Sequence, residues 1–213
     1  MWAWGIPLAA VLGTAHIVAR YGGASTAAAV LKAMPIALLA AWAALEPVPV
    51  DQRYRWLVVA GLVASIGGDV ALLFPSGFVP GLSSFLVAHL CYIAAFAPGG
   101  AGDARPWLLL APFAVVGVAM LVYLWPHLGK VRIAVIVYVS AIVTMAWRAT
   151  LRADVAAAPW PSTVLVLVGA LFFMVSDGVL SIDRFAGTFP AADAIVMSTY
   201  YAAQILIARS VAR

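Results

Sequence analysis

Long, uninterrupted apolar runs follow one another along almost the whole chain, and this feature leaves few possible folds. A helix needs about 20 residues to cross the ~30 Å hydrocarbon core of a bilayer, and the runs have this length. They do not alternate between polar and apolar residues as the strands of a membrane barrel do. Because backbone polar groups in hydrocarbon must be hydrogen-bonded internally, we expect an all-α, polytopic transmembrane helix bundle.

Composition supports the same class of protein. The 213 residues are 66% hydrophobic and only 9% charged, whereas a soluble domain is about half apolar and about one quarter charged. The net charge of +4 is dispersed, which argues against a nucleic-acid partner. The single Cys91 excludes an internal disulfide.

Proline and glycine clusters divide the chain into about eight predicted spans, and tryptophans fall near several span ends, where they favour the membrane interface. The expected spans are residues 2–20, 24–45, 54–74, 80–97, 107–125, 131–151, 161–181 and 190–211. The connections are too short for a soluble domain. We therefore expect residues 1–213 to form a single transmembrane domain, with the functional site inside the bundle.

The distribution of basic residues predicts the orientation. An even number of spans puts both termini on one side of the membrane, and that side carries more basic residues than the opposite side. The terminal side has Arg53, Arg55, Arg105, Arg148, Arg152, Arg209 and Arg213; the opposite side has Arg20, Lys130, Arg132 and Arg184. The positive-inside rule then predicts cytoplasmic termini. Abundant arginine and alanine are typical of a GC-rich bacterial genome, so we expect a bacterial plasma (inner) membrane.

Four ionisable residues lie inside predicted spans: Lys32, Asp69, His89 and Asp177. A charged side chain at the centre of a span costs roughly 2.5–3.5 kcal/mol, so each of them requires a partner or a function. The arginines near span ends, Arg184 among them, can extend to the headgroups and need no further explanation.

Lys32 precedes Pro35, which leaves the carbonyl of Leu31 without its helical donor. Lys32 either binds such a free carbonyl or extends to the interface, or it is the counter-ion of a buried carboxylate.

Other polar residues share helix faces with these positions. Ser65 lies one turn before Asp69 on a face that also has a glycine pair, and Ser176 directly precedes Asp177. His89 and Tyr92 lie on one stripe, which is either packing or part of a site; Tyr200 and Gln204 share a face and either join helices by hydrogen bonds or line a cavity.

The intramembrane polar residues are expected to lie at similar depths in the bilayer. Lys32, Asp69 and Asp177 lie in the half of the bilayer away from the termini, and His89 and Tyr200 lie near its middle. One polar pocket open to that leaflet would unite them.

No metal or cofactor is expected. A catalytic zinc typically has three protein ligands, and the chain has only His16, His89 and His127, of which His127 lies in a predicted loop. The GxSxG motif of serine lipases is also missing from the sequence.

Taken together, these strings resemble the YhhN-like family, the lysoplasmalogenase family of multi-pass membrane proteins. The resemblance extends from the second predicted span to the eighth. It is carried by residues 31–35 (Leu-Lys-Ala-Met-Pro), Gly68-Asp69 followed by Phe78, Gly81, Phe85, His89 and Tyr92, then Phe172, Ser176-Asp177 and residues 197–204 (Met-Ser-Thr-Tyr-Tyr-Ala-Ala-Gln).

The resemblance implies hydrolysis of the vinyl-ether bond of lysoplasmalogens, with a lysophospholipid substrate and the bilayer as partners. That reaction requires an acid to protonate carbon, a base for water and negative charge near the resulting cation, as glycosidases provide with two carboxylates. We expect Asp69 and Asp177 to be this catalytic pair. If Lys32 pairs with only one of them, that one is the ionised base and the other is the neutral acid. Lys32, Ser65, His89, Tyr92, Ser176, Tyr200 and Gln204 are expected to bind substrate or support the pair.

Two alternatives remain open at the level of sequence. Buried carboxylates and a lysine also suit a small proton- or solute-coupled transporter, although all the intramembrane charge lies in one half of the bilayer. A hydrolase of another ether or ester lysolipid is the second alternative. Headgroup preference and oligomeric state are not specified by the sequence.

Overall fold

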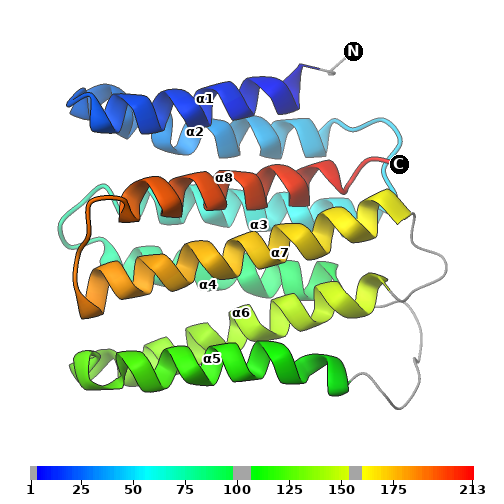
Figure 1. The fold of residues 1–213 in the computed structure, drawn as a ribbon. Coiled ribbons are helices and arrows are strands. Elements are labelled where there is room, and N and C mark those ends of the chain that lie inside the picture. Colours follow the sequence, from blue (N-terminus) through cyan, green and yellow to red (C-terminus); the bar gives the residue numbers. More distant parts are fainter. Residues whose placement is uncertain (1–3, 98–106, 154–159) are drawn as a thin grey trace.

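The protein is a bundle of eight long helices that lie roughly parallel or antiparallel to one direction (Figure 1). The computed structural model describes residues 4–97, 107–153 and 160–213. The long helices are α1 (Gly5–Tyr21), α2 (Ser25–Ala44), α3 (Gln52–Ala71), α4 (Phe78–Ala95), α5 (Ala111–Leu124), α6 (Arg132–Ala153), α7 (Trp160–Ser181) and α8 (Ala192–Arg209). Short segments flank them: η1 (Leu108–Leu110), η2 (Trp125–His127), η3 (Gly129–Val131) and the π-helical η4 (Ile182–Ala186). Among the described residues no β-strand forms, which confirms the all-α prediction.

Six helical segments of the described chain are long and apolar enough to cross a membrane. They are Ser25–Ala44, Gln52–Ala71, Phe78–Ala95, Leu108–His127, Gly129–Arg152 and Trp160–Ala186. The other two helices are α1, which has 17 residues, and α8, which buries the polar Tyr200, Tyr201 and Gln204. The predicted first span begins at residue 2, which lies outside the described residues. The chain is an integral membrane protein.

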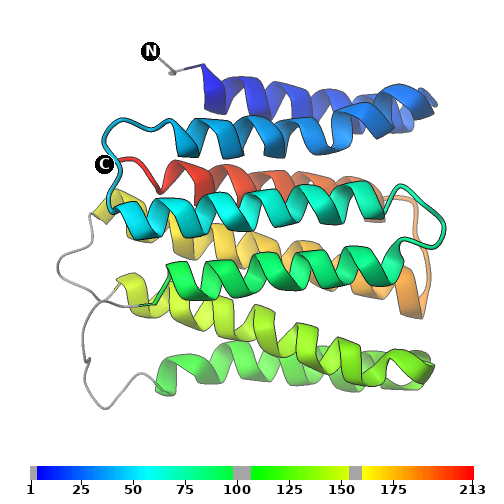
Figure 2. The ribbon, with the colours of Figure 1, turned by 180° about the vertical axis from the view of Figure 1, so that it is seen from behind.

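Seven of the helices form a ring, and α5 lies outside it. Contacts connect α1, α2, α3, α4, α6, α7 and α8 in that order, and α8 closes the ring by packing on α1 and α2. The remaining helix, α5, packs on α6 at one edge of the bundle, as both views show (Figures 1 and 2). The helix α1 begins and α8 ends at the same end of the bundle, as an even number of spans requires.

Glycines allow α3 and α4 to approach closely. A Cβ atom built on Gly68 would lie 2.6 Å from the ring of Phe85, and one on Gly61 would overlap the ring of Tyr92. At the glycine pair itself, α4 places Ser84 against Gly67 and the ring of Phe85 against Gly68. This packing fixes the α4 stripe against α3 and sets the position of His89, one turn after Phe85.

Candidate active site

Asp177, near the end of α7, is the centre of a buried polar cluster. Its Oδ2 atom accepts a hydrogen bond of 3.0 Å from the hydroxyl of Tyr138 on α6. The Nε2 atom of His89 on α4 lies 3.5 Å from the same oxygen. All three side chains are buried, and the His89 ring packs edge-on against Tyr138 and Phe173. Three helices thus bring an acid, a phenol and an imidazole to one point.

The hydrogen bonding of His89 determines what faces Asp177. Nδ1 lies 2.7 Å from the backbone carbonyl of Phe85, which can only accept, so Nδ1 carries a hydrogen. A neutral His89 then presents the lone pair of Nε2 to a carboxylate oxygen. Two acceptors repel each other unless one of them holds a proton. Within the described residues Nε2 has no hydrogen-bond partner, so a proton on the Asp177 carboxyl or on the imidazole could join the two groups.

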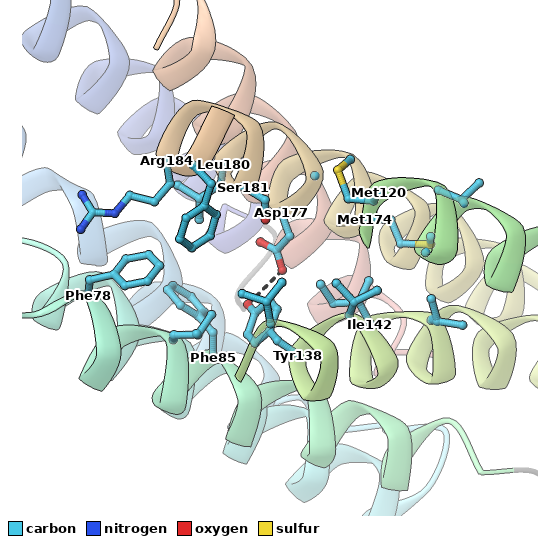
Figure 3. Close-up of a pocket in the computed structure, with 18 of the residues that line it drawn as sticks. Phe78, Phe85, Met120, Tyr138, Ile142, Met174, Asp177, Leu180, Ser181 and Arg184 are labelled. Atoms are coloured by element: carbon cyan, nitrogen blue, oxygen red, sulfur yellow. Dashed lines mark hydrogen bonds between the residues drawn. The ribbon is translucent and has the colours of Figure 1, made fainter. Parts of the chain in front are cut away.

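Asp177 and Tyr138 also line a pocket between α4, α5, α6 and α7 (Figure 3). The empty space, including the open mouth, is about 810 Å³. The walls near Asp177 are mostly apolar, with Phe85, Met120 and Met174 among them. This arrangement gives an amphiphile's hydrocarbon chain access to an ionisable pair.

Asp69, near the end of α3, belongs to a second cluster. Its Oδ2 atom accepts a hydrogen bond of 2.8 Å from the hydroxyl of Tyr200 on α8, and the carboxyl is 2% exposed. Lys32 on α2 is half-buried and has a Coulomb interaction with Asp69. Within the described residues the two form no ion pair closer than 4.0 Å. The backbone carbonyl of Lys32 accepts a hydrogen bond of 2.9 Å from Tyr201.

A fully satisfied hydrogen-bond network lies beside Asp69. Gln204 donates from Nε2 to the hydroxyl of Ser65 at 2.9 Å and accepts at Oε1 from Tyr92 at 2.7 Å. Ser65 in turn donates to the carbonyl of Gly61. Ser176 joins α7 to α8 by a 3.0 Å hydrogen bond to the carbonyl of Val196. These groups hold α3, α4, α7 and α8 in register rather than line the pocket.

The two aspartates share a depth in the bundle but not a pocket. Asp69 and Asp177 both lie near the helix ends distant from the termini, on α3 and α7, and α8 packs against both helices. Phe85 lies between the clusters: it lines the Asp177 pocket and meets Tyr200 edge-on, with ring centroids 5.9 Å apart. Of the two carboxylates, Asp177 lines the pocket.

Two residues at the pocket were not singled out from the sequence. Tyr138 lies about a third of the way along an apolar span, where a tyrosine hydroxyl inside the bilayer is a signal that could have been used. Arg184 was assigned to the interface because of its place at a span end, yet it lines the pocket mouth. Among the described residues, no group of three His, Cys, Asp or Glu side chains is arranged to hold a metal ion.

Comparisons with known proteins agree with the resemblance. The model of the YhhN family matches residues 27–211. The protein named lysoplasmalogenase TMEM86B of Homo sapiens is 36% identical over 186 residues, covering 87% of this chain and 76% of that protein. The lysoplasmalogenase of Mycobacterium bovis is 38% identical over 185 residues, covering 83% and 67%. Lysoplasmalogenase TMEM86A of Bos taurus is 39% identical over 159 residues, covering 72% and 64%.

No solved structure matches the chain. The family match begins in α2 and ends just after α8, so it includes both buried clusters. The chain belongs to the YhhN family.

Proposed function

We propose that this protein is a lysoplasmalogenase, which hydrolyses the vinyl-ether bond of a lysophospholipid to a fatty aldehyde and a glycerophospho-base. The names of the relatives support this activity. The observation that carries it is the approach of His89 Nε2 to the Asp177 carboxyl, at 3.5 Å, beside an apolar pocket.

The reaction begins with transfer of the pair's proton from Asp177 to the β-carbon of the vinyl ether. This breaks the carbon–carbon π bond and leaves an oxocarbenium ion. Water then adds to the cationic carbon, and its released proton returns to the Asp177–His89 pair. The resulting hemiacetal breaks its bond to the glycerol oxygen, which gives the free glycerol hydroxyl and the aldehyde. The reaction as written consumes only water.

Asp69 is the second catalytic carboxylate. Its negative charge lies behind Phe85 and Tyr200, and in a low-dielectric interior such a charge stabilises a cation without touching it. Lys32 acts electrostatically on Asp69, whereas the polar neighbours of Asp177 are Tyr138 and His89. The proposed division of roles therefore makes Asp177 the acid and Asp69 the ionised partner.

The remaining polar residues have supporting roles. Tyr200 orients Asp69, and the network of Ser65, Tyr92 and Gln204 fixes the helices that carry both clusters. Ser176 anchors α7 to α8 next to Asp177.

We also propose that the protein resides in the plasma (inner) membrane of a bacterium with both termini in the cytoplasm. The excess of arginine at the terminal end of the bundle supports this orientation. Arg105, one of the seven basic residues at that end, lies outside the described residues.

The test is aldehyde release from lysoplasmenylethanolamine by purified protein, measured by mass spectrometry. General acid–base groups contribute roughly 10²–10⁴-fold to rates, so we expect Asp177→Asn and Asp69→Asn each to lose at least about 100-fold in turnover. Asp193→Asn is the matched control, because Asp193 is exposed and pairs with Arg20 at 3.4 Å.

Every variant is first shown to remain folded and monodisperse in detergent. Retained turnover in either Asp177→Asn or Asp69→Asn overturns the two-aspartate mechanism. Acyl and alkyl lysolipids are assayed in parallel; cleavage of these alone would identify a different lysolipid hydrolase. Solute flux into proteoliposomes without product would instead favour a transporter.

A further inference from the structure

Arg184 is a cation at the mouth of the Asp177 pocket. It lies in the π-helical η4 that continues α7, and π-helical turns occur frequently at functional sites. Its guanidinium stacks over the ring of Phe78 at 4.5 Å, and its side chain is exposed. Among the described residues it forms no ion pair, whereas Arg20 at the same end of the bundle is paired with Asp193. The guanidinium is thus held in place by an aromatic ring while its hydrogen-bond donors stay available.

A second hollow adjoins the pocket at this arginine. It has about 570 Å³ of empty space and lies against the turn between α3 and α4, at Leu73, Phe74 and Pro75. Arg184 and Phe78 line both this hollow and the Asp177 pocket. In Figure 3 Arg184 and Phe78 lie at one end, Asp177 and Tyr138 in the middle, and Met120, Met174 and Ile142 at the other end. The charged group, the carboxylic acid and the apolar wall therefore follow one another across two hollows that share Phe78 and Arg184.

The spacing along this space matches an amphiphilic substrate. Asp177 and Arg184 are seven residues apart on α7 and η4, which corresponds to roughly 10 Å at 1.5 Å per residue. In a lysoplasmalogen, the glycerol carbons and one phosphoester oxygen separate the vinyl ether from the phosphorus atom. This separation is shorter than the distance along the helix, and the extended side chain of Arg184 can bridge the difference. When the phosphate lies at Arg184, the vinyl ether lies at Asp177 and the alkenyl chain lies along the apolar wall.

We infer that Arg184 binds the phosphate of the lysophospholipid, and that the hollow at the α3–α4 turn receives the headgroup. This inference rests on the proposed function, because it assigns the direction in which the substrate lies in that same pocket. A planar guanidinium donates paired hydrogen bonds to phosphate oxygens, which a lysine ammonium does not reproduce. Arg184 is therefore a binding residue that makes the enzyme prefer lysolipids with a phosphate.

The kinetic test compares Arg184→Gln and Arg184→Lys with wild type. Loss of a charge-assisted hydrogen bond predicts an increase in KM for lysoplasmenylethanolamine of about tenfold or more in Arg184→Gln, with a smaller change in kcat. Arg184→Lys should recover part of the loss. With a 1-alkenylglycerol, which has no phosphate, wild type and Arg184→Gln should have equal kcat/KM. Arg132→Gln is the matched control, since Arg132 is an exposed arginine at the same end that also stacks on an aromatic ring, Trp125, at 4.7 Å.

Binding is measured separately from turnover. The inference about Arg184 can then fail while the proposed function holds, and the proposed function can fail while the inference holds. The probe is a 1-O-alkyl lysophosphatidylethanolamine, which has no vinyl ether and is not a substrate of the proposed reaction. Weaker binding to Arg184→Gln than to wild type and Arg132→Gln supports the inference even if no aldehyde is released from any lysolipid. Equal binding and unchanged KM in Arg184→Gln overturn it, even if wild type is a lysoplasmalogenase. If inorganic phosphate binds to wild type as tightly as the probe does, the site belongs to a free anion, and this result would also overturn the inference.

Discussion

At the scale of single residues, the Asp177 carboxyl is defined by two neighbours with different capacities. Tyr138 donates its hydroxyl hydrogen to the carboxyl, while the imidazole of His89 can exchange a proton with it. The backbone carbonyl of Phe85 fixes the imidazole by binding Nδ1, so that Nε2 always faces Asp177. The substitution Tyr138→Phe removes the hydroxyl that binds Asp177 but keeps the ring that packs on His89. It therefore tests the hydrogen bond alone.

We expect Tyr138→Phe to lower kcat for lysoplasmalogen hydrolysis by about 10–100-fold. Asp177 becomes a carboxylate as it gives up its proton, and a hydrogen bond to a charged group is worth roughly 1.5–3 kcal/mol; about 1.4 kcal/mol corresponds to a factor of ten in rate. Tyr123→Phe, at an exposed position of α5, is the control. Steady-state kinetics of both variants check the prediction, and equal rates for the two would show that the Tyr138 hydroxyl is not used.

The sequence predicts the depth of a residue in the bilayer, but it does not predict the position of that residue around the bundle. Position along a span gives depth in the bilayer, so Asp69 and Asp177 could be predicted to lie at one level. Position around the bundle depends on which helices pack together, and this separates Asp69 on α3 from Asp177 on α7. The partner of Tyr138 is 39 residues away, so no local pattern connects the two.

At the scale of elements, the contact of α3 with α4 depends on small residues. Gly68 provides room for the ring of Phe85, which also lines the Asp177 pocket. A methyl group at this position would push the ring toward the pocket or push the two helices apart. Helix packing and pocket shape are thus coupled at one glycine.

Gly68→Ala should lower the melting temperature in detergent and also reduce turnover. A Cβ 2.6 Å from the Phe85 ring places the overpacking cost in the upper part of the usual range of about 1–3 kcal/mol, above the gain of about 1 kcal/mol in helix propensity. At Gly178 the added Cβ would meet only the terminal methyl of Met120, at 3.3 Å, so Gly178→Ala should melt at or above the wild-type temperature. A thermal unfolding assay compares the two; an equal shift in both variants would contradict this account.

At the scale of the whole molecule, the pocket lies in the half of the bundle distant from the termini. Asp177 and Arg184 are at the end of α7 and in η4, beyond which the chain turns back into α8. With cytoplasmic termini, the headgroup hollow therefore faces the exterior of the cell. The orientation of the bundle decides which leaflet supplies the substrate.

Cysteine labelling tests this orientation. In a Cys91→Ser background, Lys130→Cys should react with a membrane-impermeant maleimide in intact cells, because Lys130 is exposed at the end distant from the termini. Arg213→Cys, at the exposed C-terminal residue, should react only after the membrane is permeabilised. The reverse pattern would place the termini outside.

The position of α5 outside the ring has a consequence for the fate of the products. Val116, Gly117 and Met120 of α5 line the apolar part of the pocket, while Val115, Val118 and Val122 are exposed on the helix surface. One helix thus separates this part of the pocket from lipid. For a lysoplasmalogenase, the long-chain aldehyde is then formed one helix away from hydrocarbon, whereas the glycerophospho-base belongs in water. Because the two products favour different phases, their recombination to the hemiacetal is suppressed.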